Sequence, residues 1–191
     1  TVLENEPTRD HTEKMLKFLG AKIQIEKKGS SNNISVNGFP KLNPGIISVP
    51  GDISSASFPI ALACMIPNSK LVIKGVGLNP LRDGFIETII EMGANIKIQN
   101  KNTEAGEIVA DLHVSYSPNL VGVEVPEDRS ARMIDEYPIL SILAATATGP
   151  TIMKGIEELR FKESDRIEAI ADGLEKNGVF ITKKNDQLTV F

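Results

Sequence analysis

The amino-acid sequence predicts an α/β protein made of repeated βαβαββ units, with mixed sheets and helices buried between them. Two recurring segments carry this prediction: an amphipathic helix that runs into an alternating strand, and a helix that has no polar face. The composition agrees, because a chain of 191 residues with 41% apolar and 24% charged residues is typical of a globular protein.

The first recurring segment reads as a helix, a glycine and a half-buried strand. Its copies span 13–25, 87–98 and 167–182. Gly20, Gly93 and Gly178 stand where each helix should end, since a left-handed residue after a helix costs glycine nothing. Isoleucine or valine then alternates with other residues, which is the period of a strand with one buried face.

The second recurring segment is an apolar helix that precedes two of these copies. It spans 57–75 and 136–155. Pro59 and Pro138 correspond, and both are expected near helix starts, where the missing N–H has no partner to lose. Ser54 or Ser55 is the expected N-cap of the first helix, and Asp52 is expected to be a turn or cap residue. Because these helices are apolar nearly all round, we expect them to be buried on all sides.

These patterns divide the chain into parts. Residues 46–118 are the expected first full unit of one domain, residues 120–191 its second full unit, and residues 1–40 the end of a unit of another domain. The segment 37–45, rich in Pro, Gly and Asn, is the expected boundary or crossover. The sequence begins without methionine or a signal peptide and stops on a strand-like stretch, so we expect a fragment cut at both ends.

Composition also excludes several classes of protein. A net charge of −4 argues against a nucleic-acid binder, and apolar runs of at most about nine residues are too short for a membrane span of about 20. The single cysteine, Cys64, allows no intrachain disulfide, which indicates a reducing, cytoplasmic location. Its apolar neighbours favour a core residue over a nucleophile. His11 and His113 are isolated, so no metal site is expected. Neither of the glycine-rich nucleotide-binding motifs, G-x-x-x-x-G-K-S/T and G-x-G-x-x-G, occurs in the sequence, so nucleotide binding is not expected either.

The densest charged cluster lies in RFKESDRIEAI, residues 160–170, at a predicted helix start. If Lys162 and Arg166 share one helix face, a phosphate or carboxylate fits between them, near the positive end of the helix dipole. The alternative is an ordinary surface helix with Ser164 as its N-cap and an ion pair between Glu163 and Arg166.

Two further candidates precede other helices. Asp135, in VPEDRSARMIDEYPIL, is either a general base or a cap of the apolar helix that follows it. Arg9, in PTRDHTEKML, is either a ligand for an anion or a solvated side chain, and Thr12 or Asp10 is the expected cap of its helix.

Taken in order, TRDHTEKML, VPGDISSASFP, MGANI, VPEDRSARMIDEYPIL and LRFKESDRIEAI resemble the central and C-terminal segments of 5-enolpyruvylshikimate-3-phosphate (EPSP) synthases. The resemblance covers essentially the whole chain. The form MIDEYPIL together with RFKESDR looks like the branch of the family that contains glyphosate-tolerant bacterial enzymes.

The resemblance implies a fold, a reaction and site residues. The family has two domains, each of three βαβαββ units, and moves the enolpyruvyl group of phosphoenolpyruvate onto the 5-hydroxyl of shikimate 3-phosphate without metal or cofactor. Asp135 matches the carboxylate that binds the shikimate hydroxyls and accepts the proton, and Glu163 matches the acid/base at the enolpyruvyl methylene. Arg9 and Lys162 match contacts to shikimate 3-phosphate, and Arg166 a contact to phosphoenolpyruvate. The parent enzyme is expected to be a monomer.

The sequence also departs from the family pattern. The lysine-serine substrate loop, the Gly-rich phosphoenolpyruvate loop, the Ser-x-Gln contacts and the late Asp-His-Arg motif do not occur in it. We therefore expect the chain alone to be inactive, and an incomplete unit to expose apolar helix faces that favour self-association. The alternatives are a relative of the UDP-N-acetylglucosamine enolpyruvyl transferases, which use a reactive cysteine, and a non-catalytic truncated fragment.

Overall fold

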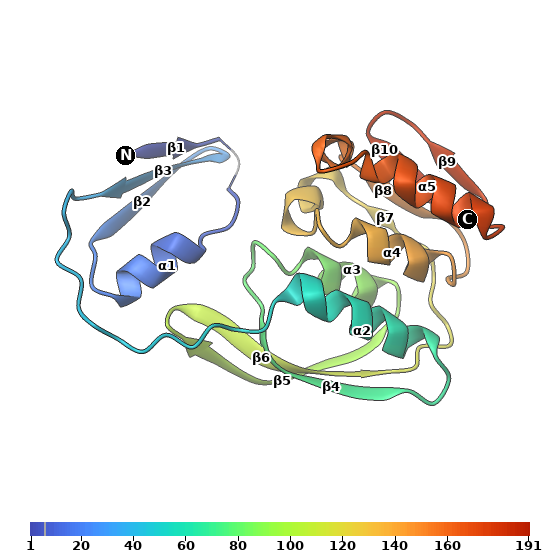
Figure 1. The fold of residues 1–191 in the computed structure, drawn as a ribbon, viewed down its shortest axis with the longest axis horizontal. Helices are drawn as coiled ribbons and strands as arrows, with labels where there is room; N and C mark the ends of the chain where they lie inside the picture. Colours follow the sequence, from blue (N-terminus) through green and yellow to red (C-terminus); the bar gives the residue numbers. More distant parts are fainter. Residues whose placement is uncertain (6) are drawn as a thin grey trace.

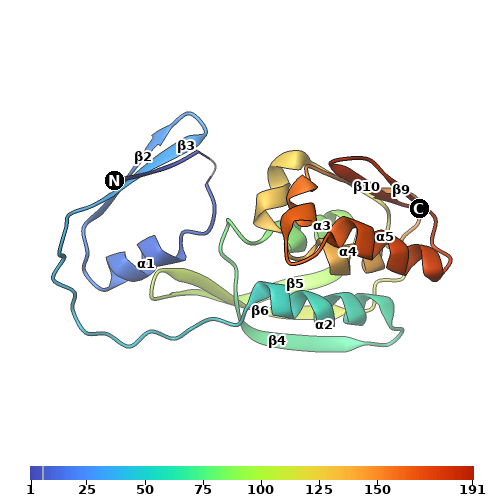
Figure 2. The same cartoon turned by 45° about the horizontal axis from the view of Figure 1, so that its top comes forward.

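The computed structural model describes residues 1–5 and 7–191, which form three sheets with their helices (Figure 1). The N-terminal unit, residues 1–36, stands to one side of the rest. Residues 37–50, which contain no helix or strand, run from it to the second unit, as Figure 2 shows. Among the described residues, none of the helices is long and apolar enough to cross a membrane. The assignment of the parts to two domains stays a prediction.

The N-terminal unit is an antiparallel sheet with one helix. Its elements are β1 (Val2–Glu4), α1 (His11–Phe18), β2 (Ile23–Lys28) and β3 (Ser31–Val36), and its strand order is β1-β3-β2. Helix α1 buries none of its residues, and Ala21 is the one buried apolar residue among the described residues of this unit. The unit therefore has almost no core of its own.

The remaining residues form two units of the same topology. The first contains α2 (Ile53–Met65), β4 (Lys70–Gly77), α3 (Gly84–Glu91), β5 (Asn95–Glu104) and β6 (Glu107–Ser115). The second contains β7 (Glu124–Val125), α4 (Tyr137–Ala144), β8 (Thr151–Lys154), α5 (Arg166–Lys176), β9 (Ile181–Lys183) and β10 (Gln187–Val190), with 3-10 turns at Glu127–Arg132 and Glu157–Phe161. The order β4-β6-β5 recurs as β8-β10-β9, so the predicted repeat is confirmed.

The opening strand differs between the two units. In the second, β7 pairs in parallel with β8, whereas in the first a single parallel bridge joins Gly51 to Val76. Pro50 has no N–H to donate to a ladder, and Ile46 is 92% exposed, so nothing buries a longer strand here. The strand expected at the start of the 46–118 unit is thus reduced to one residue pair.

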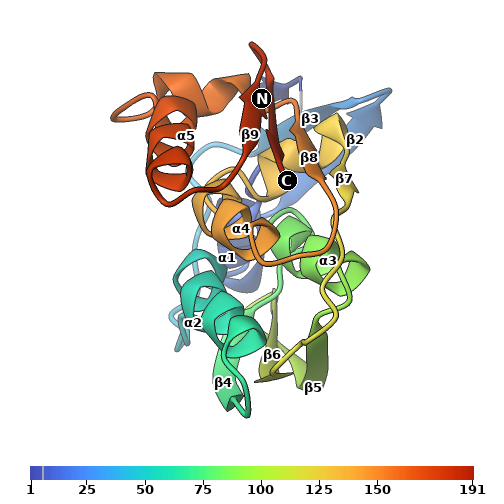
Figure 3. The same cartoon turned by 90° about the vertical axis from the view of Figure 1, so that its right-hand side faces the viewer.

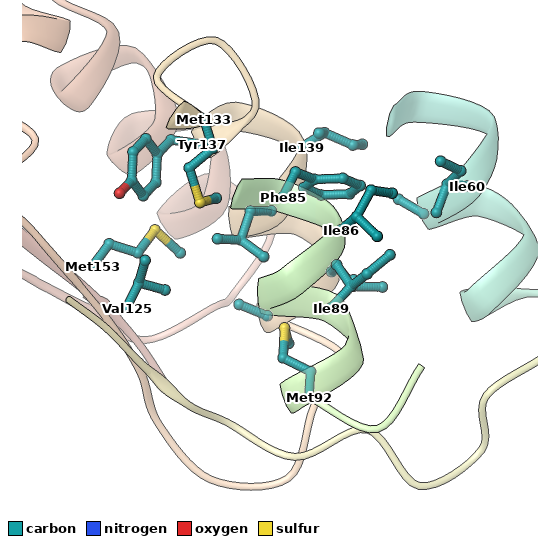
Figure 4. Packing of buried hydrophobic residues seen from close by; sticks show 14 of the residues in the cluster. Ile60, Phe85, Ile86, Ile89, Met92, Val125, Met133, Tyr137, Ile139 and Met153 are labelled. Carbon is teal, nitrogen blue, oxygen red and sulfur yellow. The ribbon is translucent and has the colours of Figure 1, made fainter. Parts of the chain in front are cut away.

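One hydrophobic core joins these two units, and none of its members comes from the described residues 1–5 and 7–50. Side chains of the helices α2, α3 and α4, such as Ile60, Phe85 and Ile139, meet in it (Figure 4). Cys64 lies fully buried in this core, and burial raises the pKa of its thiol. The prediction that Cys64 is a packed core residue is therefore confirmed.

The helices α2, α4 and α5 lie one after another along one side of the molecule (Figure 3). The prediction that the apolar helices are buried on all sides is wrong for this chain. Phe58 of α2 is 55% exposed and Ile142 of α4 is 47% exposed, because no described element covers this face. The result is an apolar helical surface beside the charged cluster described below.

Local signals at helix ends were mostly reliable. Gly20, Gly93 and Gly178 follow their helices with φ of +96°, +88° and +80°, as expected. Pro138 lies in the first turn of α4, but Pro59 lies inside α2, so its expected place was wrong. That error follows from the cap described next, because the helix starts well before the proline.

Asp52 is the N-cap of α2: its carboxylate accepts hydrogen bonds from the backbone N–H groups of Ser54 and Ser55. The expectation that Ser54 or Ser55 is the cap was therefore wrong, and the expectation for Asp52 is confirmed. Asp10 occupies the N-cap position of α1 without making a side-chain capping bond. Its carboxylate instead accepts hydrogen bonds from the side chains of Lys14 and Asn79.

Candidate active site

A cavity of about 1140 Å³ opens where the N-terminal unit meets the helices of the last unit. One end is lined by side chains of α2, α4 and α5, most of them apolar. The other end is charged, with Arg9, Asp52, Arg82, Asp135, Glu163 and Arg166 around it. Four of the sequence-predicted site residues thus line one cavity, although Arg9 is far from the others in sequence.

Asp135 lies between two arginines. Arg9 Nη2 donates to its Oδ2 at 2.6 Å, and Arg166 Nη1 donates to its Oδ1 at 3.3 Å. Partial burial opposes ionisation of this carboxyl, but the hydrogen bond and charge of Arg9, the hydrogen bond of Arg166 and the charge of Lys162 hold its pKa below the ordinary value. Asp135 is not the N-cap of α4, a position that Glu136 occupies, so the capping alternative is wrong.

Glu163 pairs with Arg166 at 2.9 Å, and this hydrogen bond lowers the pKa of the carboxyl and raises that of the guanidinium. Helix α5 begins at Arg166 because Asp165 caps it, accepting from the backbone N–H of Glu168 at 3.1 Å. Ser164 is therefore not the cap. Arg166 consequently bridges two carboxylates, Asp135 and Glu163.

Lys162 is placed differently from what the sequence suggested. It precedes α5 in an extended conformation, so it does not share a helix face with Arg166, and that interpretation was wrong. Its ammonium pairs with Glu158 and does not line the cavity. The charge still acts on Asp135, whose pKa it helps to lower.

Sequence reasoning missed a buried polar group beside the cavity. Arg82 Nη2 donates to Ser54 Oγ at 2.6 Å, and the Ser54 hydroxyl in turn donates to the carboxylate of Glu136. Glu136 is only 1% exposed, and this burial raises its pKa. The signal that points to Arg82 is the repeat, since the segment before α3 occupies the place of the charged segment before α5.

Metal-ligand residues do not cluster in the part of the chain that the structure describes. No group of three or more His, Cys, Asp or Glu side chains there is arranged to hold a metal ion. His11 instead makes a hydrogen bond through Nδ1 to Glu107 at 2.7 Å. The charged end of the cavity offers guanidinium groups for anions and carboxylates for protons.

Comparison with known proteins assigns the family. The family model of EPSP synthase (3-phosphoshikimate 1-carboxyvinyltransferase) matches residues 1–191. A 3-phosphoshikimate 1-carboxyvinyltransferase of Ruegeria sp. (strain TM1040) is 49% identical over 99% of this chain, and one of Chelativorans sp. (strain BNC1) is 51% identical over 100% of it. The chain spans 42% of the length of each of these curated relatives.

Solved structures agree. An EPSP synthase from Acinetobacter baumannii superimposes with a TM-score of 0.88 at 43% identity, over 97% of this chain and 41% of that one. The enolpyruvyl transferase NikO from Streptomyces tendae, at 20% identity and a TM-score of 0.66, shares the fold. The predicted fold class is thereby confirmed, and the chain belongs to the EPSP synthase family.

Proposed function

We propose that this chain supplies part of the active site of an enzyme that transfers the carboxyvinyl group of phosphoenolpyruvate to the 5-hydroxyl of shikimate 3-phosphate. The observation that carries the proposal is the ionised Asp135 held between Arg9 and Arg166 at the charged end of the cavity. Family membership and the names of the relatives support the same reaction.

The two substrates bring phosphate and carboxylate groups to the site. Arg9, Arg82 and Arg166 are the cations among the described residues that line the cavity, and a guanidinium binds such anions with paired hydrogen bonds. We assign Arg9 and Lys162 to shikimate 3-phosphate and Arg166 to phosphoenolpyruvate. To reach a phosphate, Lys162 has to exchange its partner Glu158 for the substrate.

Asp135 and Glu163 are assigned the proton transfers. As the 5-hydroxyl oxygen bonds to the central carbon of the enolpyruvyl group, Asp135 accepts the hydroxyl proton and the methylene carbon takes up a proton from Glu163. In the second step the methyl group returns a proton to the Glu163 carboxylate and the bond to the phosphate breaks, and the proton held by Asp135 leaves with the released phosphate.

The arginines control the proton affinity of these carboxylates. Arg166 holds Glu163 ionised, and Arg9 and Arg166 together hold Asp135 ionised. When anionic substrates engage both guanidiniums, the carboxylates lose part of this stabilisation and their proton affinity rises. Substrate binding thus prepares Asp135 to act as a base and Glu163 to carry a proton.

We infer that the chain by itself does not turn over, because the other substrate-binding motifs of the family do not occur in it. A phosphate-release assay should detect no product from the isolated chain. Activity should appear when the chain replaces the matching segment of the Acinetobacter baumannii EPSP synthase. Turnover by the isolated chain, or a folded but inactive graft, contradicts the proposal.

A UDP-N-acetylglucosamine enolpyruvyl transferase is not favoured, because the lone cysteine, Cys64, is fully buried and unavailable as a reactive loop residue.

We also propose that the isolated chain self-associates through exposed apolar side chains such as Phe58, Leu62 and Ile142. Sedimentation velocity of the chain and of a Phe58→Ser variant tests this. The full-length enzyme is proposed to be a cytoplasmic monomer.

A further inference from the structure

Arg9 and Asp135 come from opposite sides of the cavity, yet the residues beside them are anchored on one short segment. This segment, residues 78–83, connects β4 to α3. Asn79 in it bonds to Asp10, the neighbour of Arg9, and Arg82 in it bonds through Ser54 to Glu136, the neighbour of Asp135. The segment therefore lies at the junction between the N-terminal unit and the site.

The contact to the N-terminal unit is built around a buried amide. Asn79 is only 2% exposed, and its Nδ2 donates to Asp10 Oδ1 at 2.6 Å and to Glu107 Oε2 at 3.2 Å. Lys14 pairs with the same Asp10 oxygen at 2.7 Å, and His11 bonds to Glu107 at 2.7 Å. The first turn of α1 is thus fixed against the start of β6, at the hairpin that reaches below α1 in Figure 1.

The segment itself is held in one conformation. The Asn79 side-chain oxygen accepts from the backbone N–H of Leu81 at 2.9 Å, and the Asn79 carbonyl accepts from the N–H of Arg82 at 2.7 Å. Arg132 Nε donates to the carbonyl of Pro80 at 2.9 Å. An amide with both its oxygen and its nitrogen committed has a single orientation, so its hold on Asp10 is directional.

Asp10 has no competing role at the start of its own helix, because it makes no side-chain capping bond there. Its carboxylate faces Asn79 and Lys14 instead. Since Arg9 is the preceding residue, fixing Asp10 fixes the backbone from which Arg9 reaches Asp135. Without Asn79, the backbone of Arg9 is held by its own unit, which has almost no core, and by the pair of Arg9 with Asp135.

We propose that Asn79 is a positioning residue that acts through Asp10 to hold Arg9 in place for the phosphorylated substrate. The inference rests on the proposed function. It assigns no substrate contact to Asn79 itself, which lies behind the first turn of α1. Arg82 serves the opposite side of the site in the same manner, through Ser54 and Glu136.

A double-mutant cycle in the Acinetobacter baumannii graft tests the role of Asn79. Asn79→Ala should raise KM for shikimate 3-phosphate about tenfold, as expected for loss of a charge-assisted hydrogen bond, with a smaller effect on kcat. In an Arg9→Ala background, Asn79→Ala should have no further effect. Asn102→Ala, which removes an exposed amide of β5, should leave KM unchanged.

Multiplicative effects of Asn79→Ala and Arg9→Ala on KM would overturn the inference, as would an unchanged KM in Asn79→Ala. An inactive but folded wild-type graft would instead count against the proposed function. If the graft does not fold, the isolated chain is used for the test. Spin labels are attached to cysteines introduced at exposed Glu26 and Lys70, and the distance between the labels is measured. Wild type and Asn102→Ala should show one narrow distance and Asn79→Ala a broad distribution; the same distribution in all three overturns the inference.

Discussion

The N-terminal unit and the two units that follow it hold opposite sides of the same charged cavity, but by different means. Asp135, Glu163 and Arg166 lie on helices and turns anchored in a continuous apolar core. Arg9 comes from a unit with a single buried apolar residue, Ala21, among its described residues, and polar contacts attach that unit to the rest. The position of Arg9 is therefore the weaker part of the site.

Core substitutions should show this difference most strongly. Phe85→Ala removes a fully buried ring between the helices and should lower the free energy of unfolding by about 3 to 5 kcal/mol. Phe18→Ala, in a residue of α1 that is 47% exposed, should cost less than about 1 kcal/mol. Urea unfolding of both variants checks this, and equal losses would mean that the N-terminal unit has a core that the structure does not show.

At the site, Asp135→Asn should reduce kcat in the Acinetobacter baumannii graft by about 10² to 10⁴, the usual contribution of a general base. The amide keeps the size of the side chain but cannot accept the proton. Steady-state phosphate release measures the effect. A change in KM alone would show that Asp135 binds substrate without taking its proton.

High salt should weaken the attachment of the N-terminal unit and leave the core of the other two units unchanged. In the Arg9–Asp135 pair Arg9 is exposed and Asp135 is partly exposed, and the screening length falls from about 10 Å at 0.1 M to about 3 Å at 1 M salt. In 1 M sodium chloride, proteolysis within residues 37–50 should accelerate, while amide exchange in the core helices stays constant. Equal responses of the two regions would contradict the difference in attachment.

The contributions of the adjacent carboxyls of Asp135 and Glu136 to stability should change with pH in opposite directions. The folded-state pKa of Asp135 is lowered, so its contribution to stability is present above the ordinary pKa and is lost as pH falls through the folded-state value. Asp135→Asn should thus lower the free energy of unfolding at pH 7, by less than about 1 kcal/mol at this partly exposed pair, and have little effect at acidic pH.

Glu136 has a raised pKa, so its contribution to stability is present below the ordinary pKa and is lost as pH rises through the folded-state value. Glu136→Gln should therefore be less destabilising at pH 7 than at pH 3. Thermal unfolding of both variants across this range measures the two trends. Parallel pH profiles would contradict the opposite pKa shifts of the two carboxyls, lowered by arginines at Asp135 and raised by burial at Glu136.

Sequence reasoning succeeded where a structure depends on neighbouring residues. The repeat and the glycines after helices, such as Gly93, are local signals, and the structure contains them. It failed where one competing residue decides the start of a helix: Asp165 starts α5 after Lys162, and Asp52 starts α2 well before Pro59.

The sequence did not predict the tertiary contacts of Asn79 and Glu136. The bond from Asn79 to Asp10 joins residues that are 69 positions apart, and no spacing in the sequence indicates it. The burial of Glu136 likewise depends on how α2, α4 and the segment before α3 pack together. Charged residues whose role comes from packing can be named as candidates from sequence, but their partners cannot.

The contribution of Arg9 to the site is tested most directly by the affinity of the graft for shikimate 3-phosphate, measured by titration calorimetry for wild type, Arg9→Ala and Lys17→Ala. Both variants remove one positive charge from the N-terminal unit, but Lys17 is exposed near the end of α1 and does not line the cavity. Arg9→Ala should weaken binding about tenfold or more, and Lys17→Ala should leave it unchanged. Equal affinities for Arg9→Ala and wild type would show that the N-terminal unit of this chain contributes nothing to the site.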